Sequence, residues 1–332
     1  MRFLPTDEQQ AFTRSLDALL TAADTPSAVR SWAAGDPGPG RALWTRLAEA
    51  GVFALAVPEA CDGLGQRPVD LSFAFVELGR CAAPGPLAET AAAAVLLAGL
   101  DDSGPAKRLL PGIASGELVT TLGLPGSGPY VLDADMADCV LVVAPDEDGS
   151  EDSARLYLAP GHHAPVRTCA DPSRRLARPA AGGELLAAGP DVARAARAAE
   201  GWARLATAAQ GLGVGLTLLD RTVAYTKQRT QFGTAIGSFQ AVKHRLADTL
   251  IALEFARPLV FGAALTMAPA DIAAAKVAAG EAAYAAARTA LQLHGAIGYT
   301  EELDLAWWLR KARPLRDAWG NPARCRAAVL SG

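Results

Sequence analysis

The sequence predicts a mainly α-helical protein with a β domain in the middle of the chain. In the first and last parts of the chain, apolar residues recur at steps of three and four, which is typical of amphipathic helices. Between them, short β-branched or leucine-rich runs alternate with Gly, Pro and Asp clusters, which is typical of strands and turns. Alanine supplies much of the 51% hydrophobic content and aromatic residues only 6%, so helix-on-helix packing of small side chains is favoured.

The length of 332 residues fits two or three domains. We expect a helical domain at 1–116, a β domain at 117–190 and a helical bundle at 191–332. Within the first domain, the Pro and Gly residues of 57–65 predict an ordered loop, and a further helix is expected over 87–100. Apolar residues recur at helical spacing in this domain, first at Phe12, Leu16 and Leu19 and then at Leu71, Phe75 and Leu78.

Short strands are predicted for the β domain, and long helices for the bundle that follows it. The runs 117–124, 138–145 and 154–160 predict strands, and the acidic segment 146–153 predicts an exposed loop. In the bundle, apolar residues recur at helical spacing over segments long enough for the helices of a helical bundle. The apolar residues of one predicted helix face are Leu205, Leu212, Leu216, Leu219 and Val223, and those near another are Ile272, Val277, Tyr284 and Leu291.

Charge and composition exclude several classes of function. The net charge is −4, from 31 basic and 35 acidic residues, which gives no basis for a nucleic-acid partner. Neither a secretory signal nor a run of about 20 apolar residues is evident, so we expect a cytoplasmic protein with no membrane segment. The five cysteines are scattered, which predicts reduced thiols and no metal site.

The segment 229–250 combines a turn with groups that can bind a nucleotide. Gly233 suits the end of a helix, and the Ser238 hydroxyl can cap the next one, so a plain helix junction explains both. Arg229, Gln231 and Phe232, however, place a rigid five-donor cation, an amide and an aromatic ring within one turn. These groups suit a pyrophosphate and the adenine or ribose beside it.

The segment 292–302 carries Gly295 and Gly298 at the end of a long predicted helix. A glycine lets the backbone approach a ligand closely because it has no Cβ. A helix C-cap explains Gly295 equally well. We interpret His294 as a structural histidine rather than as a cofactor ligand.

Together these segments resemble the acyl-CoA dehydrogenase family of flavoproteins, and the resemblance covers nearly the whole chain. The segments 57–65 and 71–91 are similar to those of actinobacterial members, and the chain resembles the short, base-lacking subunits of their heteromeric enzymes. In the family motif QxxGGxGY, this chain has Ala296 in place of the second glycine, and the alanine adds a methyl group near the expected adenine. The family motifs RxQFG…FQ…LAD and QxxGGxGY correspond to Arg229, Gln231, Phe232, Gly233, Phe239, Gln240, Leu246, Ala247, Asp248 and to Gln292, Gly295, Ala296, Gly298, Tyr299.

The resemblance implies N-terminal helices, a central β domain and a C-terminal four-helix bundle. It also implies FAD at a subunit interface, with the flavin ring in the neighbouring subunit, and hence an oligomer. Electron-transfer flavoprotein or a similar acceptor is the implied redox partner. The residues expected to contact the adenosine pyrophosphate half of FAD are Arg229, Gln231, Phe232, Gln240, Gln292 and Gly295.

The family's catalytic base is missing from this sequence. Family members oxidise the Cα–Cβ bond of an acyl-CoA thioester, with a carboxylate taking the α proton while a hydride leaves the β carbon for the flavin. An ungapped match places Trp319 at the glutamate position, and the alternative position, before Arg204, holds Ala203. Asp317 is the nearest carboxylate, which we interpret as an exposed charge. An indole cannot accept the proton, and loss of a positioned base costs about 10²–10⁴ in rate.

The β domain also departs from the family. The TEPxxGSD-type loop and the later W-T segment line the flavin ring and the thioester in the family, whereas the corresponding segment here, 120–139, is shortened. Trp319 is then either a core tryptophan at the edge of the bundle or a plug in a vestigial acyl pocket. The adenine half of the site is kept, and the redox half is lost.

The resulting hypothesis is one subunit of a heteromeric acyl-CoA dehydrogenase, such as a heterotetramer acting in lipid metabolism or steroid degradation. A paralogous partner would supply the base and the flavin pocket, and a bulky or steroid side-chain CoA thioester is the expected substrate by analogy. One alternative is a self-sufficient homo-oligomer whose base has moved to Asp317 or Glu200. The other is a non-redox binding or scaffold protein of the same fold.

Overall fold

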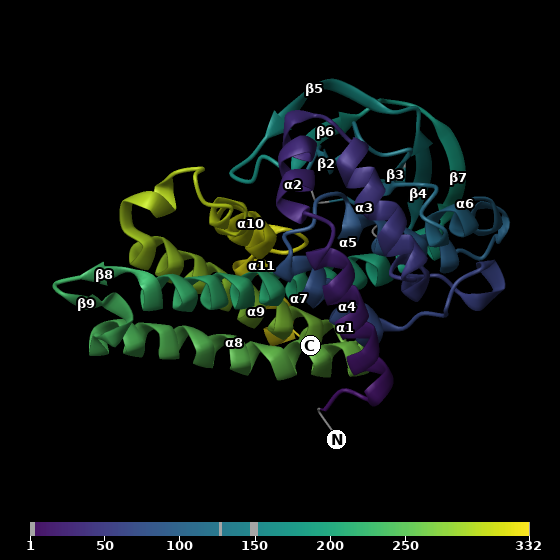
Figure 1. Cartoon of the computed structure of the whole chain (residues 1–332). Coiled ribbons are helices and arrows are strands. Elements are labelled where there is room, and N and C mark those ends of the chain that lie inside the picture. Colours follow the sequence, from purple (N-terminus) through teal and green to yellow (C-terminus); the bar gives the residue numbers. More distant parts are fainter. Residues whose placement is uncertain (1–3, 126–127, 147–151, 332) are drawn as a thin grey trace. The chain divides into compact units, whose positions relative to one another are not determined.

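The computed structural model describes residues 4–125, 128–146 and 152–331, and the chain forms two compact units (Figure 1). The bundle unit comprises the described parts of Met1–Pro26, Ser72–Ala83 and Arg204–Gly332. The sheet unit comprises the described parts of Ser27–Leu71 and Pro84–Ala203.

Helices dominate the chain and strands lie in its middle, which confirms the predicted fold class. The expected helix over 87–100 is present, and the loop at 57–65 contains only a short 3₁₀ turn. The α-helices are α1 (Asp7–Thr21), α2 (Thr25–Ala34), α3 (Gly38–Glu49), α4 (Pro68–Arg80), α5 (Leu87–Ala98), α6 (Gly104–Ala114), α7 (Pro190–Gln228), α8 (Gln240–Thr266), α9 (Pro269–His294), α10 (Leu305–Asp317) and α11 (Pro322–Ser331). The 3₁₀ turns are η1 (Phe53–Ala56), η2 (Glu59–Cys61), η3 (Ile236–Ser238) and η4 (Gly295–Tyr299).

Two sheets lie in the sheet unit. One has the order β1-β3-β4-β7, with β1 and β3 parallel and the other pairs antiparallel; the other has the antiparallel order β2-β6-β5. The three predicted strands are present as β1, β3 and β4, and of the acidic segment 146–153 the residues 147–151 lie outside the described residues. The strands are β1 (Thr120–Gly123), β2 (Val131–Leu132), β3 (Cys139–Pro145), β4 (Ala154–Ala159), β5 (His162–Thr168), β6 (Arg175–Pro179) and β7 (Glu184–Gly189).

The core of the sheet unit is built around α5. Apart from Glu89 and Thr90 this helix carries only apolar side chains, and it is buried almost throughout, as expected for a helix that is surrounded by protein. Its one central hydroxyl, on Thr90, donates to the carbonyl of Thr120 on β1. The small side chains of α5 therefore lie directly against the first strand of the larger sheet.

In the bundle unit, α4 and α7 approach each other at two glycines. A Cβ on Gly79 would overlap the carbonyl oxygen of Gln210, and a Cβ on Gly213 would overlap that of Val76. Only glycine lets the two backbones come this close. Elsewhere in this unit, the fully buried Lys276 of α9 donates to the carbonyls of Leu315 (2.6 Å) and Arg316 (2.9 Å) at the end of α10.

The Glu77 carboxyl on α4 is buried at 7% exposure and makes stability depend on pH. Burial raises its pKa from 4.5 to about 7, against the opposing charge of Arg80. Because the native carboxyl holds its proton more tightly than the unfolded one, the free energy of unfolding should fall as pH rises from about 4.5 to about 7. Glu77→Gln should remove this slope and raise stability at pH 8 by up to about 3 kcal/mol, measured by urea unfolding at pH 5 and pH 8. The exposed Glu302→Gln is the control, and an unchanged slope in Glu77→Gln would contradict the assignment.

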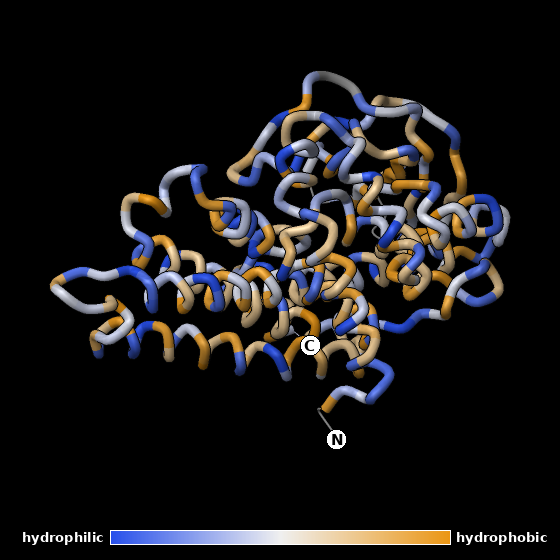
Figure 2. The backbone as a smooth tube through the Cα atoms, in the orientation of Figure 1, coloured by the Kyte–Doolittle hydropathy of each residue, from blue (hydrophilic) through white to orange (hydrophobic). Residues whose placement is uncertain are grey.

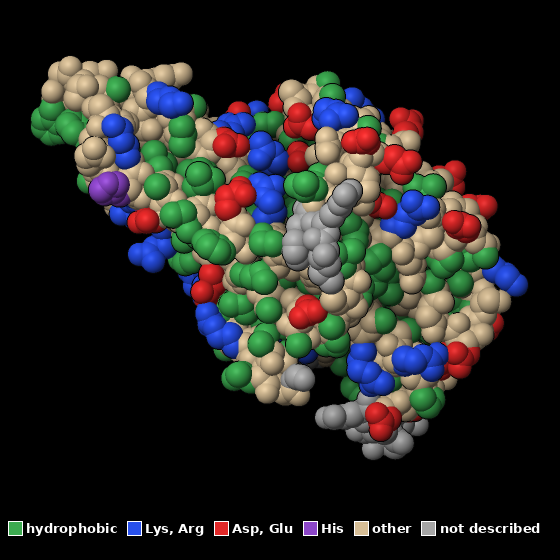
Figure 3. Space-filling view, turned by 90° about the horizontal axis from the view of Figure 1, so that it is seen from below, with side chains coloured by type: hydrophobic (Ala, Val, Ile, Leu, Met, Phe, Trp, Pro, Cys, Tyr) green, Lys and Arg blue, Asp and Glu red, His purple; other side chains and the backbone are tan. Residues whose placement is uncertain are grey.

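The α8 helix has an outward apolar face. By length and composition it could cross a membrane, but a core helix of a water-soluble bundle meets the same criteria. Figure 2 shows apolar segments recurring along α8, and Figure 3 views the molecule from that side. The large side chains exposed on α8 are Leu250, Ile251, Phe255, Leu259 and Leu265.

The expected cap at Ser238 is wrong. The α8 helix begins at Gln240 with Phe239 as its N-cap residue and has no side-chain cap. Ser238 instead lies in η3, where its hydroxyl donates to the carbonyl of Ala235 at 2.7 Å. Because Ser238 lies in the 3₁₀ turn and Phe239 takes the N-cap position, the serine hydroxyl does not accept a hydrogen bond from the first-turn amides of α8.

Candidate functional site

A β-hairpin joins α7 to α8 and carries the first predicted motif. Its strands β8 (Thr230–Gln231) and β9 (Thr234–Ala235) are antiparallel, and the hairpin projects past the ends of both helices (Figure 1). The two turn residues, Phe232 and Gly233, have φ of +54° and +79°. Both positive values match the type I′ turn that favours tight hairpins, in which glycine is at ease and phenylalanine is strained.

The hairpin exposes the side chains that a nucleotide would need. Phe232 is 93% exposed, and its ring meets that of Phe239 edge-on at 6.3 Å between centroids. Arg229, Gln231 and Gln240 are also exposed. A large aromatic ring held in a strained turn and left in solvent is a common mark of a binding position.

The second motif lies at the same end of the bundle unit. The Tyr225 hydroxyl on α7 donates to the carbonyl of His294 at 3.4 Å, and the two rings stack at 4.2 Å. The Arg229 amide in turn donates to the Tyr225 carbonyl, one turn along the chain. The exposed Gln292 and Gly295 therefore lie at the end of the bundle unit that carries the hairpin.

His294 packs inside the bundle unit, and Gly295 caps the end of α9. The imidazole of His294 is buried, its Nδ1 lies 2.8 Å from the Ala290 carbonyl, and burial lowers its pKa. Gly295, at φ +63°, ends α9. Tyr225, which brings the two motifs together, was not predicted as a site residue, because no local pattern marks its contact with His294.

Trp319, which is predicted to occupy the family's glutamate position, has an unusual backbone conformation. Trp319 has φ +58°, and the next residue, Gly320, has φ +132°. The carbonyl of Trp319 accepts a hydrogen bond from Nε of Arg204 on α7 at 3.0 Å, and Ala203 beside it is fully buried. Asp317, at the end of α10, is exposed as expected. The two residues at the predicted base positions, Ala203 and Trp319, carry no carboxylate.

The two halves of the expected site are far apart within the bundle unit. Arg204 and the end of α7 at Gln228 lie on one helix, and a helix rises about 1.5 Å per residue, so they are separated by about 36 Å. The predicted adenine contacts and the predicted base positions therefore lie at opposite ends of this stretch of α7.

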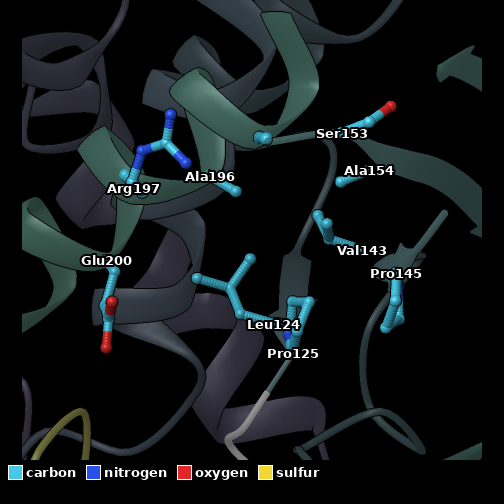
Figure 4. A pocket seen from close by; sticks show the side chains of 10 residues that line it. Leu124, Pro125, Val143, Pro145, Ser153, Ala154, Ala196, Arg197 and Glu200 are labelled. Atoms are coloured by element: carbon cyan, nitrogen blue, oxygen red, sulfur yellow. The ribbon is translucent and has the colours of Figure 1, made fainter. Parts of the chain in front are cut away.

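The sheet unit holds a pocket of about 320 Å³ (Figure 4). Arg197 and Glu200 contribute from α7, and Leu124 and Pro125 directly follow β1. Its mostly apolar wall, with one carboxylate and one guanidinium, suits an acyl chain carrying a polar group. Its remaining lining residues are Val143, Pro145, Ser153, Ala154, Ala193 and Ala196.

The cysteines are unpaired. Cys139 and Cys325 are buried, and the other three are half-buried. Among the residues that the structure describes, no group of three or more His, Cys, Asp or Glu side chains could hold a metal ion.

Comparisons with known proteins define the family. Family models for the N-terminal and C-terminal domains of acyl-CoA dehydrogenases match residues 6–117 and 193–329. The acyl-CoA dehydrogenase IpdE2 of Mycobacterium tuberculosis is 35% identical over 93% of this chain and 92% of its own length. IpdE2 of Mycolicibacterium smegmatis is 31% identical, over 96% of both chains. The chain therefore belongs to the acyl-CoA dehydrogenase family.

Solved structures agree on the fold. The ChsE4–ChsE5 complex of Mycobacterium tuberculosis has a TM-score of 0.84 at 25% identity, over 100% of this chain and 98% of its own. A variant of the Tcur3481–Tcur3483 steroid ACAD has a TM-score of 0.86 at 26% identity, over 98% and 97%. The predicted family resemblance and fold are confirmed, and the family's cofactor is FAD, as predicted.

Proposed function

We propose that this chain is one subunit of a heteromeric acyl-CoA dehydrogenase. It supplies the adenine-side contacts to FAD, and a paralogous partner supplies the catalytic base and the flavin pocket. The observation that carries the proposal is the contrast within the bundle unit. The exposed hairpin end keeps the family's nucleotide motif, while the predicted base position in the turn that contacts Arg204, about 36 Å along α7 from Gln228, holds Trp319.

The side chains at the hairpin end suit the adenine half of FAD. Arg229 has no carboxylate partner among the described residues, so its guanidinium is available to a pyrophosphate. The ring of Phe232 offers a flat face, and the amides of Gln231, Gln240 and Gln292 offer donors and acceptors. When bound, FAD supplies the hydride acceptor; the residues here bind and orient it.

The exposed apolar face of α8 supports an oligomer. A monomeric soluble protein seldom leaves five large apolar side chains on one helix in water. Two of the similar structures are named as pairs, ChsE4–ChsE5 and Tcur3481–Tcur3483, and the latter is named a steroid ACAD. By analogy we propose a heterotetramer in the cytoplasm, a bulky or steroid side-chain CoA thioester as substrate, and an electron-transfer flavoprotein or similar acceptor. The three-part division 1–116, 117–190 and 191–332 remains part of this proposal.

Co-expression with a paralogous dehydrogenase that carries the glutamate tests the proposal. Acyl-CoA oxidation should require both chains, because neither alone completes a site with both the adenine contacts and the base. A partner that reaches full activity unaided would favour a scaffold role for this chain. Full activity of this chain alone would favour a relocated base.

Glu200 is the second candidate for catalysis, because its carboxylate lines the pocket in Figure 4. Under the heteromer proposal, Glu200→Gln and Asp317→Asn should each leave kcat of the complex within about twofold. If either carboxylate is the relocated base, its amide should lower kcat by about 10²–10⁴. Steady-state rates of the purified complex distinguish the two outcomes, and Glu302→Gln, on the exposed surface, is the control.

A further inference from the structure

A tyrosine and two arginines share one face of the three-stranded sheet β2-β6-β5. Tyr130 directly precedes β2, Arg178 lies on β6, and the neighbouring pair Val131 and Ala177 is buried. Because successive residues of a strand point to opposite faces, Tyr130 and Arg178 lie on the face away from that buried pair.

Arg167 joins them from the edge strand. It is paired with Leu176 on β6, two residues from Arg178, so both arginines lie on the same face. The Cζ atoms of Arg167 and Arg178 each lie 5.3 Å from the centroid of the Tyr130 ring. This distance is within the range of a cation–π contact, which holds both guanidinium groups over one neutral ring.

The charge of this cluster is unbalanced. Five other arginines of the sheet unit have a carboxylate within 2.6–2.9 Å, whereas neither Arg167 nor Arg178 has one among the described residues. Two cations on one ring repel each other, and an anion between them would remove that repulsion. The paired arginines are Arg41, Arg108, Arg155, Arg175 and Arg194.

We propose that Arg167, Arg178 and Tyr130 form a binding site for a phosphate group. A guanidinium presents paired donors that match two phosphate oxygens, and the tyrosine hydroxyl adds a further donor. Both arginines are exposed, so the ligand arrives from water as free phosphate or as the phosphate of a nucleotide. The site is independent of the proposed redox function and would persist in a chain that never binds FAD.

Calorimetric titration of the full chain with inorganic phosphate and with ADP, at low ionic strength, tests the site. Arg178→Gln and Arg167→Gln should each weaken binding about 10-fold or more, as expected for loss of a charge-assisted hydrogen bond. Arg194→Gln is the matched control, since it removes an exposed arginine of the same unit that already has a partner, Asp101. Its affinity for phosphate should stay within about twofold of wild type.

Two further variants serve as controls. One separates recognition by the paired donors of the guanidinium from attraction by positive charge, and the other checks that a substitution in the cluster leaves the fold intact. Arg178→Lys keeps the charge but loses the paired donors, so it should bind more weakly than wild type. Tyr130→Phe keeps the ring, and its thermal unfolding should match that of wild type. Equal affinity for phosphate and ADP identifies free phosphate as the ligand, and tenfold tighter ADP identifies a nucleotide. Absence of binding at millimolar phosphate, or equal losses in Arg194→Gln and Arg178→Gln, would overturn the proposal.

Discussion

Replacing Arg229 by glutamine is expected to weaken FAD binding to the co-expressed complex by about 10–100-fold. Arg229 leaves the end of α7 for the hairpin, is exposed, and has no carboxylate partner among the described residues. A charge-assisted hydrogen bond to a phosphate contributes about 1.5–3 kcal/mol, which sets the expected range. Fluorescence titration of the apo-complex with FAD gives the dissociation constant.

Lys227→Gln is the control for this change. Lys227 is also an exposed cation in the last turn of α7, two residues before Arg229, but it is outside the family motif. Its loss should change the FAD dissociation constant by less than about twofold. Equal weakening by the two substitutions would mean that general positive charge, rather than a specific contact from Arg229, attracts the cofactor.

Replacing Gly213 by alanine is expected to destabilise the bundle unit by about 3 kcal/mol or more. A methyl group there would overlap the carbonyl oxygen of Val76 on α4, and the Arg80 amide nitrogen lies 2.8 Å from the same point. Both obstacles are backbone atoms, so the helices must separate to make room, and the core around them loses packing. Chemical denaturation of the purified chain measures the loss.

Gly211→Ala controls for the general effect of alanine in α7. Its added methyl group would meet its nearest neighbour, the Ala279 carbonyl oxygen, at 3.9 Å, an ordinary contact. Alanine also favours helix over glycine by up to about 1 kcal/mol. This variant should therefore be as stable as wild type or more so. A Gly213→Ala protein that is equally stable would show that α4 and α7 do not approach as described.

Long periodic elements were predictable from the sequence, and short or tertiary ones were not. The stripe at Leu205, Leu212 and Leu216 becomes the buried face of α7, since a 3.6-residue period is visible in the residues themselves. The hairpin β8–β9 has strands of two residues, too short to show alternation. Its Phe232 turn also places a non-glycine residue at positive φ, against local preference.

The candidate site was predictable in its parts but not in its assembly. The nucleotide motifs were visible as residue types, yet their meeting depends on the Tyr225–His294 contact between α7 and α9, which no local pattern encodes. The buried Glu77 is likewise a tertiary feature, because α4 alone gives no sign that its carboxyl loses water. Such contacts arise from packing between segments distant in the sequence.

The FAD content of the purified complex tests the central claim most directly. Each complete site needs the hairpin of one chain and the flavin pocket of the other, so a pair of this chain and its partner can complete only one site. Absorbance of released flavin should give one FAD per pair, and this chain alone should hold no stoichiometric FAD. One FAD per chain in the isolated protein, together with acyl-CoA oxidation, would contradict the account.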